Sequence, residues 1–95
     1  MNQGGVELLG RVAVSTAGRD RRRAFLVVGL SGEGYVLLSD GDLRKMEHPK
    51  KKKLRHVRIE PAVAEDVRGQ LMQGNHVQDV QIRKSILSLG YGLEE

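Results

Sequence analysis

The first 60 residues contain short apolar segments with the pattern of β-strands. Residues 8–15 (LLGRVAVS), 25–30 (FLVVGL) and 35–39 (YVLLS) are alternating or continuously apolar, and a glycine-containing turn at 31–34 joins the last two. Valine, leucine and aromatic residues in runs of this length favour strands. These segments therefore predict three consecutive strands.

Two further strands are expected before residue 61. The Asp40-Gly41 pair is a strong hairpin signal and predicts a fourth strand at 42–46. Residues 48–53, His48-Pro49 and four consecutive lysines, are expected to form an exposed connection to a last strand at 54–59 (LRHVRI). Five short strands with tight turns in about 50 residues favour a small, strongly bent barrel.

After Pro61 the apolar period changes to about four residues, which is typical of amphipathic helices. Gly74 and Gly90 supply stop signals, and Asp79 is a candidate N-cap for the second helix. The apolar stripes of the two expected helices are Val63, Val67 and Leu71, and then Ile82, Ile86 and Leu89.

These patterns predict one structural domain that is mainly β, with α-helices at its C-terminal end. Residues 1–60 are expected to form the barrel with its basic loops, and residues 61–95 a helical hairpin packed on it. Two short helices are marginal alone, so their apolar faces need a partner. They either close one end of the barrel or offer a docking surface to another protein.

The positive charge is concentrated in the first part of the chain. Residues 1–60 carry 13 Lys/Arg and 7 Asp/Glu, a net charge of +6, whereas residues 61–95 carry 3 and 5, a net charge of −2. This division suggests that a polyanion contacts the first part. Arginines cluster in TAGRDRRRAFLVV at 16–28, between two predicted strands, and lysines in the run at 50–53.

Composition excludes several other functions. The chain has no cysteine, which rules out disulfides and thiolate metal sites, and its three histidines lack metal-ligand spacing. Asp40 and Asp42 are explained as turn residues, so neither an enzyme, a cofactor nor a metal site is expected. No segment has the pattern of a signal peptide or a transmembrane helix, which indicates a cytoplasmic protein that does not enter a membrane.

The segment VAVSTAGRDRRRAFLVV resembles the KOW motif, a valine-rich strand that runs into a glycine, a basic loop and a second apolar strand. Val12, Val14, Gly18 and Val27 occupy the motif positions, and Arg22 stands where KOW loops usually carry a second glycine. With DGDLRK at 40–45 and PKKKKLRH at 49–56, the chain is similar to small bacterial KOW-domain RNA-binding proteins that resemble the fourteen-e class of large-subunit ribosomal proteins. This resemblance covers residues 8 to about 90 and implies an SH3-like barrel that binds RNA.

The basic residues fit that partner chemically. Arginine presents a planar fork of donors that matches phosphate oxygens, and lysines are mobile charges that release counterions when bound. No residue set indicates base-edge readout, so recognition of RNA shape and backbone is expected. The candidate RNA contacts, with Gly18 as the motif glycine, are Arg19, Arg21, Arg22, Arg23, Arg44, Lys45, Lys50, Lys51, Lys52, Lys53, Arg55 and Arg58.

Some alternatives remain open at this level. The lysine run is also explained as a solvated surface, or in a eukaryotic cell as a nuclear import signal, and Tyr35 as a core residue or a stacking surface. The expected function is RNA binding, with ribosomal RNA as partner, ribosomal proteins as further contacts and a monomer as the favoured state. The alternative is a protein-interaction module of the transcription or translation machinery, although the three aromatic residues are few for a peptide groove.

Overall fold

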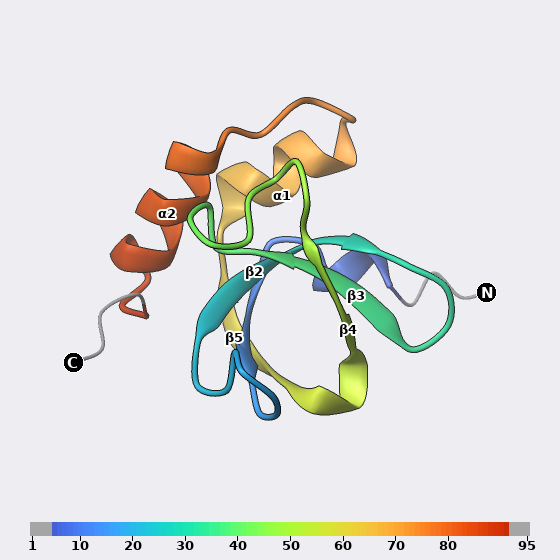
Figure 1. Ribbon diagram of the computed structural model, residues 1–95. Helices are drawn as coiled ribbons and strands as arrows, with labels where there is room; N and C mark the ends of the chain where they lie inside the picture. Colours follow the sequence, from blue (N-terminus) through green and yellow to red (C-terminus); the bar gives the residue numbers. More distant parts are fainter. Residues whose placement is uncertain (1–4, 92–95) are drawn as a thin grey trace.

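A computed structural model describes residues 5–91 and consists of a five-stranded antiparallel sheet followed by two helices (Figure 1). A short 3-10 helix precedes the sheet, and a second one joins its two edge strands. In chain order the elements are η1 (Val6–Leu8), β1 (Arg11–Ser15), β2 (Ala24–Leu30), β3 (Tyr35–Ser39), β4 (Lys50–Lys53), η2 (Leu54–His56), β5 (Val57–Val63), α1 (Glu65–Met72) and α2 (Asp79–Ser88).

The sheet is strongly curled but open. Its strand order is β4-β3-β2-β1-β5, so β4 and β5 are the two edges, with no pairing between them in the described part of the chain. Register shifts between Val27 and Gly29 and between Arg11 and Ala13 interrupt two of the ladders. Irregularities of this kind bend strands and increase their twist, which accounts for the curl.

The prediction for residues 40–53 was wrong. Asp40-Gly41 does not make a two-residue hairpin, and 42–46 is not a strand, because the Asp40 carboxylate accepts hydrogen bonds from the backbone N–H groups of Asp42 and Arg44 (both 2.9 Å) and folds this segment into a loop. The four lysines are not a connection either. They form β4, paired along β3 from Tyr35↔Lys53 to Leu38↔Lys50.

The other strands lie close to their predicted places, with shifts at the ends. The first expected strand begins only at Arg11, since residues 6–8 form η1. The last one begins at Val57 and continues to Val63, through Pro61, so the change from strand to helix comes at Ala64. Proline is tolerated here because β5 is an edge strand, where one N–H needs no ladder partner.

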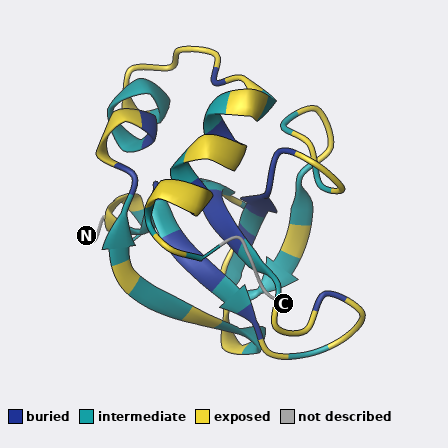
Figure 2. Cartoon of the chain, turned by 90° about the vertical axis from the view of Figure 1, so that its left-hand side faces the viewer, coloured by how far each residue is buried: buried dark blue, intermediate teal, exposed yellow. Residues whose placement is uncertain are grey.

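The central strands β1 and β2 are buried on both faces. On the concave face, Phe25 and Val27 pack with Val36 and Leu38 of β3, and all four are fully or almost fully buried. On the opposite face, the helices cover the sheet (Figure 2). The second core contains Val12, Leu26, Ala64, Val67, Val77, Ile82 and Ile86.

The helices therefore cover a face of the sheet and not an end of a barrel. Both end as predicted at a glycine with positive φ, Gly74 (77°) and Gly90 (90°). The prediction that Asp79 caps α2 was wrong, because Asp79 is the first residue of the helix and Gln78 is its N-cap. The Asp79 carboxylate instead accepts the N–H of Met46 (2.7 Å) and fixes the 40–49 loop to the helix. Within residues 5–91, neither helix is long and apolar enough to cross a membrane.

Candidate nucleic-acid interface

The arginine-rich loop between β1 and β2, residues 16–23, is closed by an unusual backbone arrangement. The N–H of Arg22 donates to the carbonyl of Ser15 (2.8 Å), while the N–H of Ser15 donates to the carbonyl of Arg23 (3.0 Å). Arg22 and Arg23 thus both face Ser15, as in a β-bulge whose first residue is normally a glycine in the left-handed conformation. Arg22 occupies that position with φ 72°, and it is the one non-glycine residue with positive φ in the described chain. The loop therefore holds an arginine where the backbone favours glycine.

Two reciprocal ion pairs connect this loop to the 40–49 loop. Arg23 Nη2 lies 2.7 Å from Asp40 Oδ2, and Arg44 Nη2 lies 3.3 Å from Asp20 Oδ2. Both aspartates are almost buried, with exposed fractions of 6% for Asp20 and 7% for Asp40. Arg23 and Arg44, two of the predicted RNA contacts, thus have a structural partner.

Asp40 organises the junction between the two loops. Burial of its carboxyl group raises the pKa, but hydrogen bonds from the Arg23 guanidinium and from the backbone N–H groups of Arg44 and Asp42 outweigh burial. The pKa of Asp40 is consequently lower than the ordinary value, and the group is a carboxylate at neutral pH. A charged Asp40 therefore holds the Arg23 guanidinium at the junction between the two loops.

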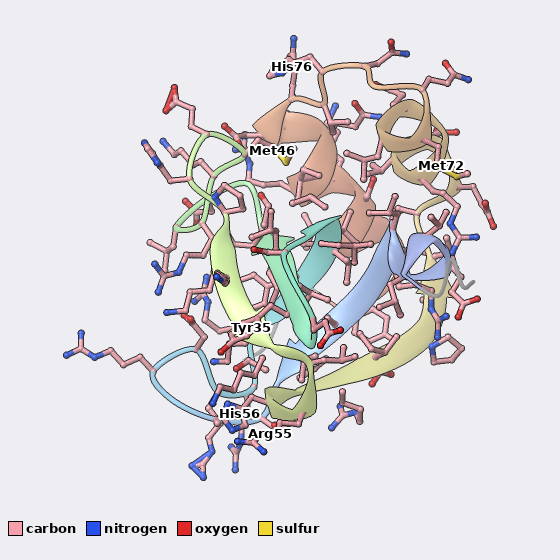
Figure 3. The ribbon with its side chains drawn as sticks, turned by 90° about the vertical axis from the view of Figure 1, so that its right-hand side faces the viewer. Tyr35, Met46, Arg55, His56, Met72 and His76 are labelled. Carbon is pink, nitrogen blue, oxygen red and sulfur yellow. The ribbon has the colours of Figure 1, made fainter. Side chains whose placement is uncertain are left out.

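The remaining arginines of the loop lie at the surface together with groups from β4 and η2. Arg19, Arg21 and Arg22 are exposed. Lys52 Nζ donates to the carbonyl of Ala17 (2.7 Å), and the N–H of Thr16 donates to the carbonyl of His56 (2.9 Å). These bonds hold η2 against the loop, and Figure 3 shows Arg55 and His56 beside it. We call this surface the basic end; it consists of Arg19, Arg21, Arg22, Lys52 and Arg55.

The lysines of β4 do not form one continuous track, because neighbouring side chains of a strand point to opposite faces. Lys52 and Lys50 pair with the buried Val36 and Leu38, and Lys52 reaches the β1–β2 loop from there. Lys51 lies on the other face, with Nζ 4.8 Å from the centre of the Tyr35 ring. The half-buried Tyr35 is therefore covered on one side by a cation.

Lysine on an edge strand also has a purely structural explanation. Charged side chains along an unpaired edge prevent the strand from pairing with another chain. β4 is such an edge, so Lys50–Lys53 are not evidence for nucleic acid by themselves.

The other sequence-predicted residues are not among the five that form the basic end. Lys45 is exposed in the 40–49 loop, and Lys50 and Lys53 begin and end β4. Arg58 of β5 pairs with Glu60 (Nε to Oε2, 2.6 Å). The motif glycine Gly18 has φ 79°, a conformation that favours glycine, and its N-terminal neighbour Ala17 accepts the Lys52 bond.

Hydrogen bonds to Glu60 of β5 shift the pKa values of Glu60 itself and of Tyr91. Donation from the Arg58 guanidinium and from the Tyr91 hydroxyl lowers the pKa of Glu60. The same bond, 3.0 Å from Tyr91 Oη to Glu60 Oε1, raises the pKa of Tyr91 because it holds the hydroxyl proton next to a carboxylate. Glu60 is thus a carboxylate that ties residue 91 to β5.

Sequence reasoning missed Arg83 and Tyr91. They lie near the arginine loop in space, although 60 or more residues separate them from Arg21–Arg23. Arg83 is exposed and lies next to the apolar stripe of α2, but the sequence pattern of a helix does not show which loop the helix contacts. The two residues together with the loop line a groove.

No group of three or more His, Asp or Glu side chains that could hold a metal ion occurs within residues 5–91. A scan against models of protein families finds no match, and a search of curated proteins finds none either.

Proposed function

We propose that the protein binds RNA by contacting the phosphate backbone with the basic end, without catalysis. The partner we propose is ribosomal RNA, which makes the chain a ribosome-associated cytoplasmic protein with ribosomal proteins as neighbours. The choice of ribosomal RNA rests on the resemblance of residues 8 to about 90 to KOW-domain proteins. RNA binding itself is supported by the charges described above.

The observation that carries the proposal is the sorting of charge within the β1–β2 loop. Its only acid, Asp20, is turned inward to Arg44, while Arg19, Arg21 and Arg22 are exposed. The outward surface of the loop is therefore uniformly positive and attached to the fold through Lys52. Guanidinium groups on such a surface can bind phosphate oxygens through charge-assisted hydrogen bonds.

The backbone at Arg22 adds a second argument. A non-glycine residue in the left-handed region costs about 1–2 kcal/mol. Strain of this kind is commonly found at functional positions. An arginine at φ 72° in an exposed loop, where glycine would fit without strain, suggests that its side chain is needed for binding.

We also propose that the curled sheet is an SH3-like barrel. The curled sheet, the packed concave core and the short η2 between the two edge strands support an SH3-like barrel.

The alternative function, a protein-interaction module, is favoured by one observation: β4 and β5 are both unpaired edges to which a peptide strand could add. The lysines along β4 oppose that for all but acidic peptides.

The test is a salt titration of RNA binding by fluorescence anisotropy, with a labelled RNA hairpin between 50 and 200 mM KCl. The variant replaces Arg19→Gln, Arg21→Gln and Arg22→Asn together, since asparagine tolerates the left-handed backbone at position 22. Arg23 stays unchanged because it pairs with Asp40. Loss of three phosphate contacts should reduce the slope of log K against log salt by about 2–3.

The matched control replaces the same three arginines by lysine, which keeps the charge and removes the planar fork. It should retain the salt slope and lose only part of the affinity. Equal binding by the wild-type protein and the Gln/Gln/Asn variant would contradict the proposal. Salt-sensitive co-sedimentation of the wild-type protein with large ribosomal subunits, lost in that variant, tests the choice of ribosomal RNA.

A further inference from the structure

A groove of about 600 Å³ runs between the arginine loop and α2. Arg21, Arg22 and Arg23 line one side, and Arg83, Ile86 and Leu87 of α2 line the other. Tyr91 completes the wall of the helix side. The groove lies beside the basic end and shares Arg21 and Arg22 with it.

The fold holds both walls in place. Arg83, Ile86 and Leu87 are spaced i, i+3 and i+4, so they share one face of α2. After the helix, the N–H of Gly90 donates to the carbonyl of Leu87 (2.9 Å) and the N–H of Tyr91 to that of Ile86 (3.0 Å). This pair of bonds is the Schellman arrangement, which turns the chain back and places Tyr91 against the last turn of the helix.

The 40–49 loop separates the two walls and is fixed to both of them. Arg23 pairs with Asp40, and Arg83 Nη1 donates to the carbonyl of Gly41 (2.7 Å). A methyl group on Gly41 would lie 2.3 Å from the carbonyl oxygen of Asp79, so loop and helix are in direct backbone contact. The width of the groove is therefore set by the fold.

The two walls of the groove also differ in chemistry. Four arginines and two aspartates, Asp40 and Asp42, line the groove, a net charge of +2. This charge suits a single phosphate group better than a densely charged polyanion. The α2 wall offers Leu87, which is 51% exposed, and Tyr91 to a flat apolar ring.

We propose that this groove holds one unpaired nucleotide of the bound RNA, with its phosphate on the arginine wall and its base against Leu87 and Tyr91. The proposal rests on RNA binding as the function. The volume lies within the roughly 300–1,000 Å³ typical of sites for small organic ligands, and it is too small for a double helix. The other partly exposed aromatic residue, Tyr35, offers a less open surface because Lys51 covers its ring.

The experiment compares two RNA hairpins that differ by a single-nucleotide bulge. We expect the wild-type protein to bind the bulged hairpin at least about fivefold more tightly, the lower end of the range for stacking of one base on an aromatic side chain. Leu87→Lys should reduce this ratio to about one. Met72→Lys is the matched control, because Met72 is a similarly exposed apolar residue (58%) on α1.

The two variants distinguish an effect of the groove from an effect of overall charge, since each adds one positive charge but only Leu87 lines the groove. A bulge preference that Leu87→Lys abolishes and Met72→Lys retains supports the groove. Crosslinking of a 4-thiouridine placed in the bulge to residues 83–91 supports it independently. Salt-sensitive binding without bulge preference, or crosslinking at Tyr35, would overturn the groove and leave RNA binding in place, whereas failure to bind either hairpin would overturn both proposals.

Discussion

Arg22→Gly is expected to make the protein more stable while it weakens RNA binding. The wild-type arginine has φ 72° and an exposed side chain. Relief of the left-handed backbone should gain about 1–2 kcal/mol. Glycine also gives the unfolded chain more freedom, which costs about 0.4–1 kcal/mol. The net increase in unfolding free energy should therefore be roughly 0.5–1 kcal/mol, a rise in Tm of about 2–8 °C for a domain of this size.

Thermal and urea unfolding followed by circular dichroism measure this change. Arg21→Gly is the control, because Arg21 is a neighbouring exposed arginine whose φ is not positive. In Arg21→Gly no backbone strain is relieved, and glycine only gives the unfolded chain more freedom, so the unfolding free energy should fall by about 0.4–1 kcal/mol. Both variants remove one charge from the basic end and should weaken RNA binding to a similar degree. Equal destabilisation by the two glycines would refute the left-handed conformation of Arg22 and with it the argument from strain.

Three further predictions concern the scaffold. The lowered pKa of Asp40 means that its carboxylate stabilises the fold at neutral pH, and that this contribution is lost as the pH falls below about 4 toward the folded pKa. Asp40→Asn should therefore flatten the decline in unfolding free energy that is measured between pH 5 and 2. Gly41→Ala should destabilise far more than Gly32→Ala in urea unfolding, because both glycines have positive φ but only Gly41 has a backbone oxygen within 3 Å of the added methyl group. Ile82→Ala should lower the unfolding free energy by about 2–5 kcal/mol, since Ile82 is fully buried between α2 and the sheet. Sheet and helix signals should still unfold in a single transition; separate transitions would mean that the helices fold independently.

Local patterns were sufficient for elements whose residues prefer one structure regardless of their neighbours. The apolar segment 35–39 became β3 with unchanged ends, and the two helices end at Gly74 and Gly90 as expected. Glycine terminates a helix through a backbone conformation that other residues avoid, so this signal is local. The concentration of positive charge in residues 1–60 is likewise a property of composition alone.

The tertiary structure decided the state of residues with weak or conflicting preferences. Four consecutive lysines carry no strand pattern, and they form β4 because β3 offers an unpaired edge next to them. The Asp40-Gly41 pair resembles a hairpin turn, but the Asp40 carboxylate accepts the N–H groups of Asp42 and Arg44 and folds the segment into a loop. The tertiary contribution is the ion pair of Asp40 with Arg23, a residue 17 positions earlier.

Which arginines are available for a ligand was also beyond the sequence. TAGRDRRR presents four equivalent basic side chains, yet Arg23 pairs with Asp40 and Asp20 turns inward to Arg44, which leaves Arg19, Arg21 and Arg22 at the surface. Composition determined that this chain carries a positive surface. Only the folding of distant segments against each other determined its shape, because ion pairs and grooves depend on distances that a linear order of residues does not contain.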